Sequence, residues 1–428
     1  MRSDTGIRTW LQTTTGVVAV LLLVQFLTGV LLAFYYVPSV DHAYTTVSYV
    51  EKVLSSGSWI RSLHHYGSQW LTVFVFLHVI RLFWSGAYAA NRIQWIVAIL
   101  ILGLVMAAGG TGYSLPWDAR AFFSTRVAEG LMAGLPFAGR IARLWLLGGS
   151  EISSITLSRF FALHVLVIPA LIGALVVWRL FRSQIAELLG SRDVIVGGLV
   201  FLVLALWALQ HPAPLGPAVT EAGADYLPRP GAQFLWLYQS LKYIPGGLGS
   251  IVGVVLPGIV LAVLVVLPWL KQQRLIAGSL LAAGVVLVVM MTTASYLSDR
   301  RDPHTAKQFA RQAAEEEAWR REPFKPATIA LAATSTSNAT ASGSAPVMYT
   351  KFCANCHGAH GQGAQQGPLR FPPLLDVSAK PRRSVDDIVG LLKDPTAYGL
   401  EPPMRSFSNK LTEEQMREIA EWIVKLKK

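Results

Sequence analysis

The chain has 428 residues, of which 53% are hydrophobic and only 14% are charged, and its formal net charge at pH 7 is +12. So little polar surface excludes an ordinary soluble globule and indicates a protein that crosses the membrane several times. The positive charge does not indicate nucleic-acid binding, because Lys and Arg lie in loops between apolar runs and in the tail rather than along one basic stripe.

Seven apolar segments have the composition of membrane-spanning helices, and most approach the ~20 residues needed to cross a hydrocarbon core. They are 16–37, 67–90, 93–112, 160–182, 194–209, 250–270 and 275–296. Short loops on the side of the N-terminus are rich in Arg, so the positive-inside rule predicts that this end is cytoplasmic. With seven spans, we expect a multi-pass protein of the inner (cytoplasmic) membrane whose C-terminal tail is periplasmic or otherwise extracytoplasmic.

The part of the chain that follows the last apolar segment differs in composition from the part before it. A charged, helix-forming stretch at 303–322 precedes an uncharged stretch rich in Ala, Ser and Thr, which has the composition of a flexible linker. We therefore expect a membrane domain at 1–298, a charged helix and linker at 299–346, and a compact domain at 347–428. The predicted fold class is mostly α, with a seven-helix transmembrane bundle followed by a small all-α domain.

The last domain contains the only two cysteines of the chain, Cys353 and Cys356, in the motif CANCH. A disulfide between them is one alternative, and a structural zinc site is another, although zinc needs four ligands that this tail does not obviously supply. The spacing Cys-x-x-Cys-His is typical of a haem bound covalently through two thioethers, with the imidazole of His357 as an axial ligand.

A single-haem domain of this kind needs a second axial ligand, usually a methionine. Met404, in the stretch GLEPPMRSF, has a suitable position. Met416 is the alternative, but it lies in an amphipathic helical pattern, where methionine more often packs in a core. The CHGAHGQG motif, the Pro-Pro-Met turn and the closing helix resemble the class I cytochrome c family over about 347–428.

His64, His78 and His164 lie in or directly beside the apolar spans, where an ionisable side chain is costly and indicates a functional site. His64 and His78, both in the stretch 61–81, lie within about 40° of one helix face and ~21 Å apart along its axis. His164 opens the fourth span. Both spans run from outside to inside, so His64 and His164 lie at one depth and can bind one haem from opposite faces. The alternative for a single histidine is a hydrogen bond to a neighbouring helix.

Over roughly residues 8–298 the chain resembles cytochrome b of quinol-oxidising cytochrome bc complexes. The matching stretches are QFLTGVLLAFYYVPSV (25–40), LHHYGSQWLTVFVFLHVIR (63–81), GTGYSLPWD (110–118), LPFAGRIARLWLLGG (135–149) and TLSRFFALH (156–164). The resemblance implies a b haem near each membrane face, with Arg61, Arg81 and Arg159 on the haem propionates. It also implies an iron–sulfur (Rieske-type) or other redox subunit, a quinone, and a soluble or membrane electron carrier as partners.

Two departures from the family pattern affect the expected chemistry. The family carries a second histidine in the fourth span, at a position that corresponds here to Trp178 or Arg179, so His78 has no imidazole partner. The inner haem is then absent, five-coordinate or bound by an unusual ligand. In the outer quinol site Gly231 stands where the family carries a glutamate, and glycine cannot accept the protons that a quinol releases.

The sequence therefore predicts a membrane electron-transfer subunit of a cytochrome bc-type complex. It passes electrons between at least one b haem, one covalent c haem on a tether, and a quinone pool or another redox partner. The alternative is a haem-bearing membrane anchor of another respiratory or photosynthetic enzyme, with a degenerate quinol-oxidation site.

Overall fold

The structure is a computed structural model. It describes residues 13–182, 191–222, 225–244, 246–270, 274–324, 345–357, 361, 364–366, 369–371, 374, 384–398, 406–408 and 410–426. The chain divides into two compact units, Met1–Ile329 and Ala330–Lys428.

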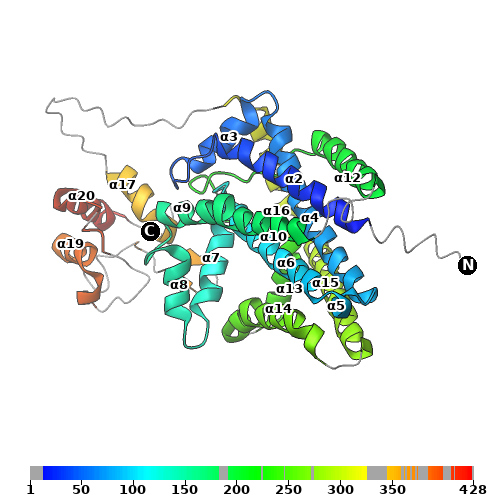
Figure 1. The fold of residues 1–428 in the computed structure, drawn as a ribbon. Coiled ribbons are helices and arrows are strands. Elements are labelled where there is room, and N and C mark those ends of the chain that lie inside the picture. The colour runs from blue at the N-terminus through cyan, green and yellow to red at the C-terminus, as the bar shows by residue number, and fades with distance from the viewer. Residues whose placement is uncertain are drawn as a thin grey trace, which may run out of the picture. The chain divides into compact units, whose positions relative to one another are not determined.

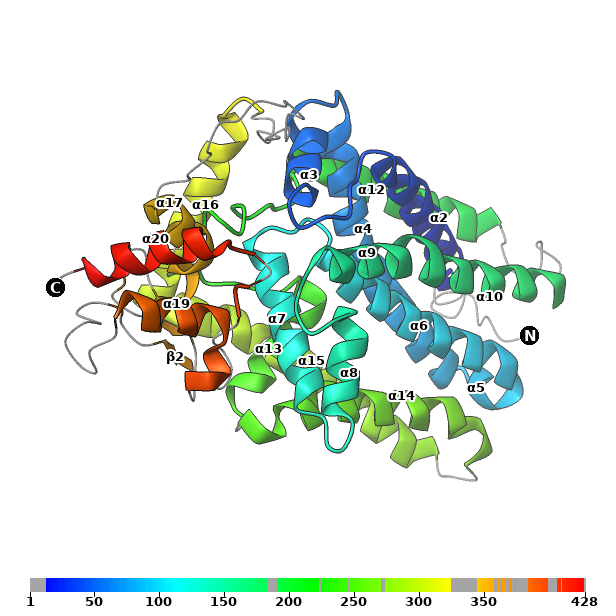
Figure 2. The ribbon, with the colours of Figure 1, turned by 90° about the vertical axis from the view of Figure 1, so that its left-hand side faces the viewer.

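Seven helical stretches in the described residues are long and apolar enough to cross a membrane, which confirms the predicted bundle. They are α2 (Thr14–Ala33), α4 (Gly57–Trp84), α6 (Arg92–Tyr113), the continuous run of α9 (Ser154–Ala162), η1 (Leu163–Val167) and α10 (Ile168–Arg182), α12 (Ser191–Gln210), the run of η4 (Ile251–Val255), α14 (Leu256–Val266) and η5 (Leu267–Trp269), and α15 (Arg274–Arg301). Figures 1 and 2 show these helices from two sides.

Shorter elements connect the spans. They are α3 (Ala43–Lys52), α5 (Ala87–Ala90), α7 (Ala119–Ala133), α8 (Gly139–Leu147), η2 (Ala232–Phe234), α13 (Leu235–Lys242), η3 (Gly246–Leu248) and α16 (Pro303–Arg321).

Helix α4 packs against α2, α6 and α12 in the first unit. Leu21, Trp95 and Leu204, from these three neighbours, are fully buried in the shared core. Helix α4 begins at Gly57, well before the predicted span at 67–90. Hydropathy does not reveal the earlier start, because the first part of the helix is polar. In the structure, Arg61 and Ser62 in this part are buried and hydrogen-bonded.

Helix α16 corresponds to the charged stretch expected at 303–322, and it belongs to the first unit. The helix begins at Pro303, and the side chain of Asp302 accepts hydrogen bonds from the first free backbone N–H groups. The carboxylate of Glu316 accepts bonds from Arg120 (2.6 Å), Arg320 (2.8 Å) and the backbone N–H of Leu215 (3.0 Å). These bonds hold α16 against the loops of the membrane domain.

The second unit is a small, mostly helical domain, as predicted. Its elements are α17 (Ala345–Phe352), α18 (Ala354–His357), β1 (Ala364–Gln366), β2 (Leu369–Phe371), α19 (Val385–Lys393), η6 (Pro395–Tyr398) and α20 (Glu413–Val424). Strands β1 and β2 form a short antiparallel hairpin. Helix α20 packs against α17 and α19, and fully buried Tyr349 and Ile419 lie in their common core.

A buried ion network joins α3, α4 and α16. The carboxylate of Glu51, whose side chain is only 3% exposed, pairs with Arg61 at 2.9 Å and also with Arg320. Burial alone raises the pKa of Glu51, but Arg61 and the Ser58 hydroxyl outweigh it, so the net pKa lies below the ordinary glutamate value. A lowered folded-state pKa stabilises the fold above the ordinary glutamate pKa, about 4.3, and this contribution is lost as the pH falls through the folded-state value.

We predict that Glu51→Gln destabilises the first unit by about 3–5 kcal/mol, because it leaves two buried guanidinium groups without their shared carboxylate. Glu317→Gln is the matched control, since it removes a carboxylate from an exposed pair with Arg321 on α16 and should cost less than about 0.5 kcal/mol. Thermal unfolding of the purified chain in one detergent measures both. Equal midpoints for the two variants would contradict the prediction.

Candidate functional site

A cavity of about 1030 Å³ runs through the first unit between α2, α4, α6 and α10. We call the end near His64 the outer arm and the end near His78 the inner arm. The outer arm is walled by residues 227 and 229–233 and by one face of α16. A cavity of this size lies at the upper end of the ~300–1,000 Å³ that one small-molecule site usually takes.

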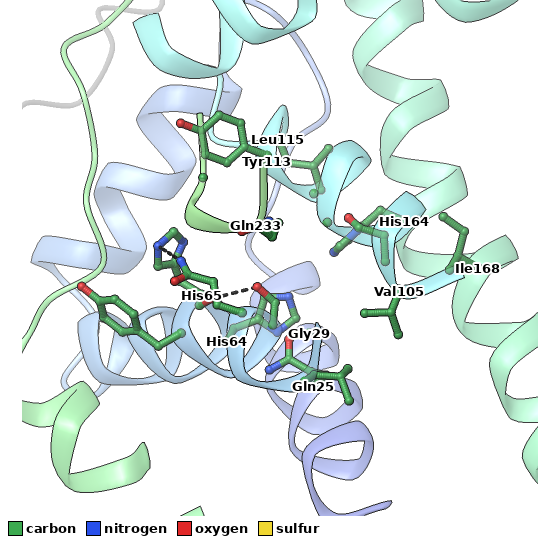
Figure 3. Close-up of a pocket in the computed structure, with 18 of the residues that line it drawn as sticks. Gln25, Gly29, His64, His65, Val105, Tyr113, Leu115, His164, Ile168 and Gln233 are labelled. Carbon is green, nitrogen blue, oxygen red and sulfur yellow. Dashed lines mark hydrogen bonds between the residues drawn. The ribbon is translucent and has the colours of Figure 1, made fainter. Parts of the chain in front are cut away.

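His64 and His164 face one another across the outer arm (Figure 3). Their ring centroids are 6.0 Å apart, and the ring planes are inclined at 80°. Two imidazoles bonded at about 2 Å to opposite sides of one metal have centroids about 6 Å apart, allowing for the size of the rings. The observed separation therefore fits the pairing expected from the sequence.

Hydrogen bonds fix which nitrogen of each ring carries the proton. His64 Nδ1 lies 2.9 Å from the Thr28 hydroxyl, which donates its own hydrogen to the Val24 carbonyl at 2.6 Å. The Thr28 oxygen must then accept from His64 Nδ1–H. His164 Nδ1 lies 3.0 Å from the Ala108 carbonyl, which can only accept. Both rings consequently keep the Nε2 lone pair for a metal, the usual arrangement of a ligating histidine.

The backbone around these rings is shaped to make room for them. A Cβ at Gly112 would overlap the His164 ring, and one at Gly29 would lie 3.1 Å from His64 Cε1. His164 itself lies in η1, a single π-helical turn within the fourth span. Such turns occur frequently at functional sites, because they re-aim side chains without ending the helix.

His78 lies in the inner arm, and its surroundings resemble those of His64. The Thr14 hydroxyl lies 3.0 Å from His78 Nδ1. Gln94 and Arg179 also line this arm, whereas Trp178 is not among the described residues that do. The sequence left Trp178 and Arg179 as the two residues that could occupy the position of the family's second histidine. Of these two, Arg179 lines the cavity.

Arg61 lines the outer arm, and its guanidinium is held by several groups. Besides the ion pair with Glu51, it donates to the carbonyls of Ala213 (2.8 Å) and Pro214 (2.7 Å). Its position is therefore fixed by the loop that follows α12. A preorganised cation of this kind suits a carboxylate ligand.

Arg81 and Arg159 are the other two arginines predicted to bind haem propionates, and neither lines the cavity. The Arg159 guanidinium instead lies 5.6 Å from the ring centre of Trp145. Arg120, which sequence reasoning missed, does line the outer arm. Burial opposes its charge, but Asp118 and Glu316 raise the pKa of Arg120 above its ordinary value. No sequence signal marked it, because its partner Glu316 lies in a distant part of the sequence.

The segment that closes the outer arm carries an amide instead of a carboxylate. Gly231 and Gln233 both line the cavity, and Figure 3 shows Gln233 near His164 and Tyr113. The Gln233 Oε1 atom is buried and has no hydrogen-bond partner in the described structure. The sequence signal that could have identified Gln233 is an isolated glutamine in the apolar run AQFLWLY. This amide can orient a hydroxyl or carbonyl group, but it cannot take up a proton.

In the second unit, Cys353 and His357 are buried on consecutive turns, with a backbone bond from His357 N–H to the Cys353 carbonyl at 3.0 Å. Met416 is 3% exposed and lies within the same core as Cys353. The side chain of Cys356 and the whole of Met404 fall outside the described residues. The predicted axial pair of His357 and Met404 thus stays a prediction.

Two family models match separate parts of the chain. Residues 5–185 match the model described as cytochrome b/b6/petB, and residues 344–427 match the model described as cytochrome c. These domains imply haem b and covalently bound haem c.

Several known proteins are similar to the membrane part. The cytochrome b subunit of menaquinol:cytochrome c reductase from Geobacillus thermodenitrificans is 40% identical over 149 residues, covering 34% of this chain and 66% of the relative. Cytochrome b of Rickettsia prowazekii (strain Madrid E) is 30% identical over 294 residues, covering 62% of this chain and 72% of that protein. Cytochrome b6 of Prochlorococcus marinus (strain NATL1A) is 36% identical over 159 residues, covering 37% and 73%.

The chain spans just under two thirds of the length of the first of these relatives. A solved structure titled "Hyperthermophilic respiratory Complex III" has a similar fold, with a TM-score of 0.53 and 19% identity over 74% of this chain and 90% of that one. The identity and coverage of the Rickettsia and Prochlorococcus relatives, together with the family models, show that this multi-pass membrane chain belongs to the cytochrome b/b6 family and also carries a cytochrome c domain.

Proposed function

We propose that the chain is a membrane electron-transfer subunit of a cytochrome bc-type complex, which passes electrons between b haem, the c haem of its second unit, and a quinone pool or another redox partner. The observation that carries this proposal is the pair of facing imidazoles, His64 and His164, whose Nδ1 protons are already engaged. When bound, haem supplies one-electron chemistry, and the chain supplies the ligands and the apolar walls around it.

Individual residues have definite roles in this proposal. His64 and His164 are the axial ligands of the outer b haem, and Arg61 at the same arm is placed to pair with a propionate. Cys353 and Cys356 attach the c haem. His357 and Met404 are its axial ligands. Arg81 and Arg159 remain predicted propionate partners, although the cavity does not reach them in the described structure.

The location and partners follow from the same function. We propose that the chain lies in the inner membrane, with its N-terminus cytoplasmic and its cytochrome c domain periplasmic, because the Arg-rich loops favour this orientation. A Rieske-type iron–sulfur subunit, a quinone and a mobile electron carrier are its proposed partners. The similarity to a menaquinol:cytochrome c reductase subunit supports a quinone and a cytochrome c as partners.

One observation favours the second candidate, a haem-bearing anchor that does not itself oxidise quinol. The cavity wall formed by Gly231 and Gln233 offers no proton acceptor of its own. A quinol that gives up electrons must also release protons, so oxidation at this wall would need another group to receive them.

Reduction by an added quinol in native membranes distinguishes the two candidates. The electron-transfer subunit predicts that the quinol reduces b haem and the c haem, and that His164→Ala abolishes the reduction of low-spin b haem while the amount of c haem is unchanged. The anchor predicts that the quinol reduces neither haem, although dithionite reduces both. That second result would overturn the main proposal.

We predict that Gly112→Ala lowers the content of low-spin b haem, because the added methyl group displaces the His164 ring. The overpacking should also cost about 1–3 kcal/mol of stability. Gly198→Ala is the control, since it lies in another span and its Cβ would meet no atom within 4 Å. Absorption spectra and thermal unfolding measure the two effects. A normal b-haem spectrum in Gly112→Ala would argue against ligation by His164.

We predict that Met404→Ala lowers the reduction potential of the c haem, because a thioether ligand favours the reduced iron. The weak sulfur-to-iron absorption band near the red end of the spectrum should also disappear. Redox titration of the purified chain measures the potential. An unchanged spectrum would assign the axial position to Met416 or another residue, and Met416→Leu is the matched variant that tests this.

A further inference from the structure

The cavity does not end at the His64–His164 pair. It continues along α4 into the inner arm, where Thr15, Gln94 and Arg179 lie on its walls together with His78. The spacing of His64 and His78 on α4 places the two imidazoles ~21 Å apart along the helix axis. At that separation, a group bound at His78 would not overlap one bound between His64 and His164.

The contacts of His78 repeat those of His64. Thr14 and Thr28 have the same sequence spacing on α2 as His64 and His78 have on α4, and the Oγ1-to-Nδ1 distances are 3.0 Å for Thr14 with His78 and 2.9 Å for Thr28 with His64. Because α2 and α4 are antiparallel neighbours, each threonine meets one histidine at its own depth. In both pairs Nδ1 faces the hydroxyl and Nε2 is the remaining nitrogen, which is the arrangement that suits a metal ligand.

The inner arm differs from the outer arm at the opposite wall. Arg179 lines it where a second imidazole would be required. Arginine stays protonated in proteins and has no lone pair to donate to a metal. Apart from His78, the described residues on the walls of this arm include no imidazole, thiolate, thioether or phenol group. Among the described residues, a metal held by His78 would therefore have one protein ligand.

We propose that the inner arm binds a second b-type haem through His78 alone, with the opposite axial position left open beside Arg179. This inference rests on the proposed function but goes beyond it, because it assigns a high-spin haem that can take a small exogenous ligand.

Replacing Arg179 by histidine tests the assignment directly. The wild-type chain should contain two b haems for each c haem, one low-spin and one high-spin. Arg179→His should convert the high-spin signal to a low-spin one by completing an imidazole pair. Trp178→His is the matched control, because it places the same side chain at the neighbouring position, which does not line the cavity, and it should leave the spectrum unchanged.

His78→Ala should remove the high-spin haem and halve the b-haem content, while the low-spin b haem and the c haem report that the protein is folded. Cyanide should convert the wild-type high-spin signal to low-spin and have no effect on His78→Ala. One b haem per c haem in the wild type, unaltered by His78→Ala, would overturn the inference and leave the proposed function intact. Absence of any b haem would overturn the proposed function itself.

Discussion

The structure of the first unit depends on one constraint, which is that a polar side chain inside the hydrocarbon core needs a hydrogen-bond partner. Helices α2 and α4 meet this constraint twice, through Thr28 with His64 and through Thr14 with His78. These bonds set the register of the two antiparallel helices. They also direct the Nε2 atom of each histidine away from the threonine. The same hydrogen bonds thus fix the packing of the two helices and the orientation of the two imidazole rings.

Hydropathy was sufficient to predict the seven spans, because each one must cover a bilayer of fixed thickness with apolar side chains. It misplaced the start of α4, since Arg61 and Ser62 are buried there through bonds to the distant loop at 213–214. That His64 and His164 face one another could be predicted from their equal depth in the membrane. Which of Trp178 and Arg179 lines the cavity could not be predicted in this way, because it depends on the rotation of the fourth helix about its axis, which the π-helical turn η1 alters.

Helix α16 shows a second limit of sequence reasoning. Its alternating charges are typical of a solvated helix, and the sequence grouped it with the linker that follows. In the structure, Glu316 and Arg320 pair with charges from α7 and α3, so the helix forms a wall of the outer arm. These ion pairs join residues far apart in the chain, and no local pattern reveals them. The result is that a segment beyond the seventh span helps to enclose the cavity.

The two departures from the family pattern lie at opposite ends of one cavity and have different consequences. At the outer end, Gln233 can orient a ligand but cannot accept a proton, so any proton released there must reach another group. At the inner end, Arg179 leaves His78 as the only imidazole among the described residues of that arm. An iron with two imidazole ligands has no free position and can only exchange electrons, whereas an iron with one can also bind a small molecule. With the haems assigned as proposed, the cavity would separate electron exchange, at the His64–His164 pair, from ligand chemistry at the inner arm.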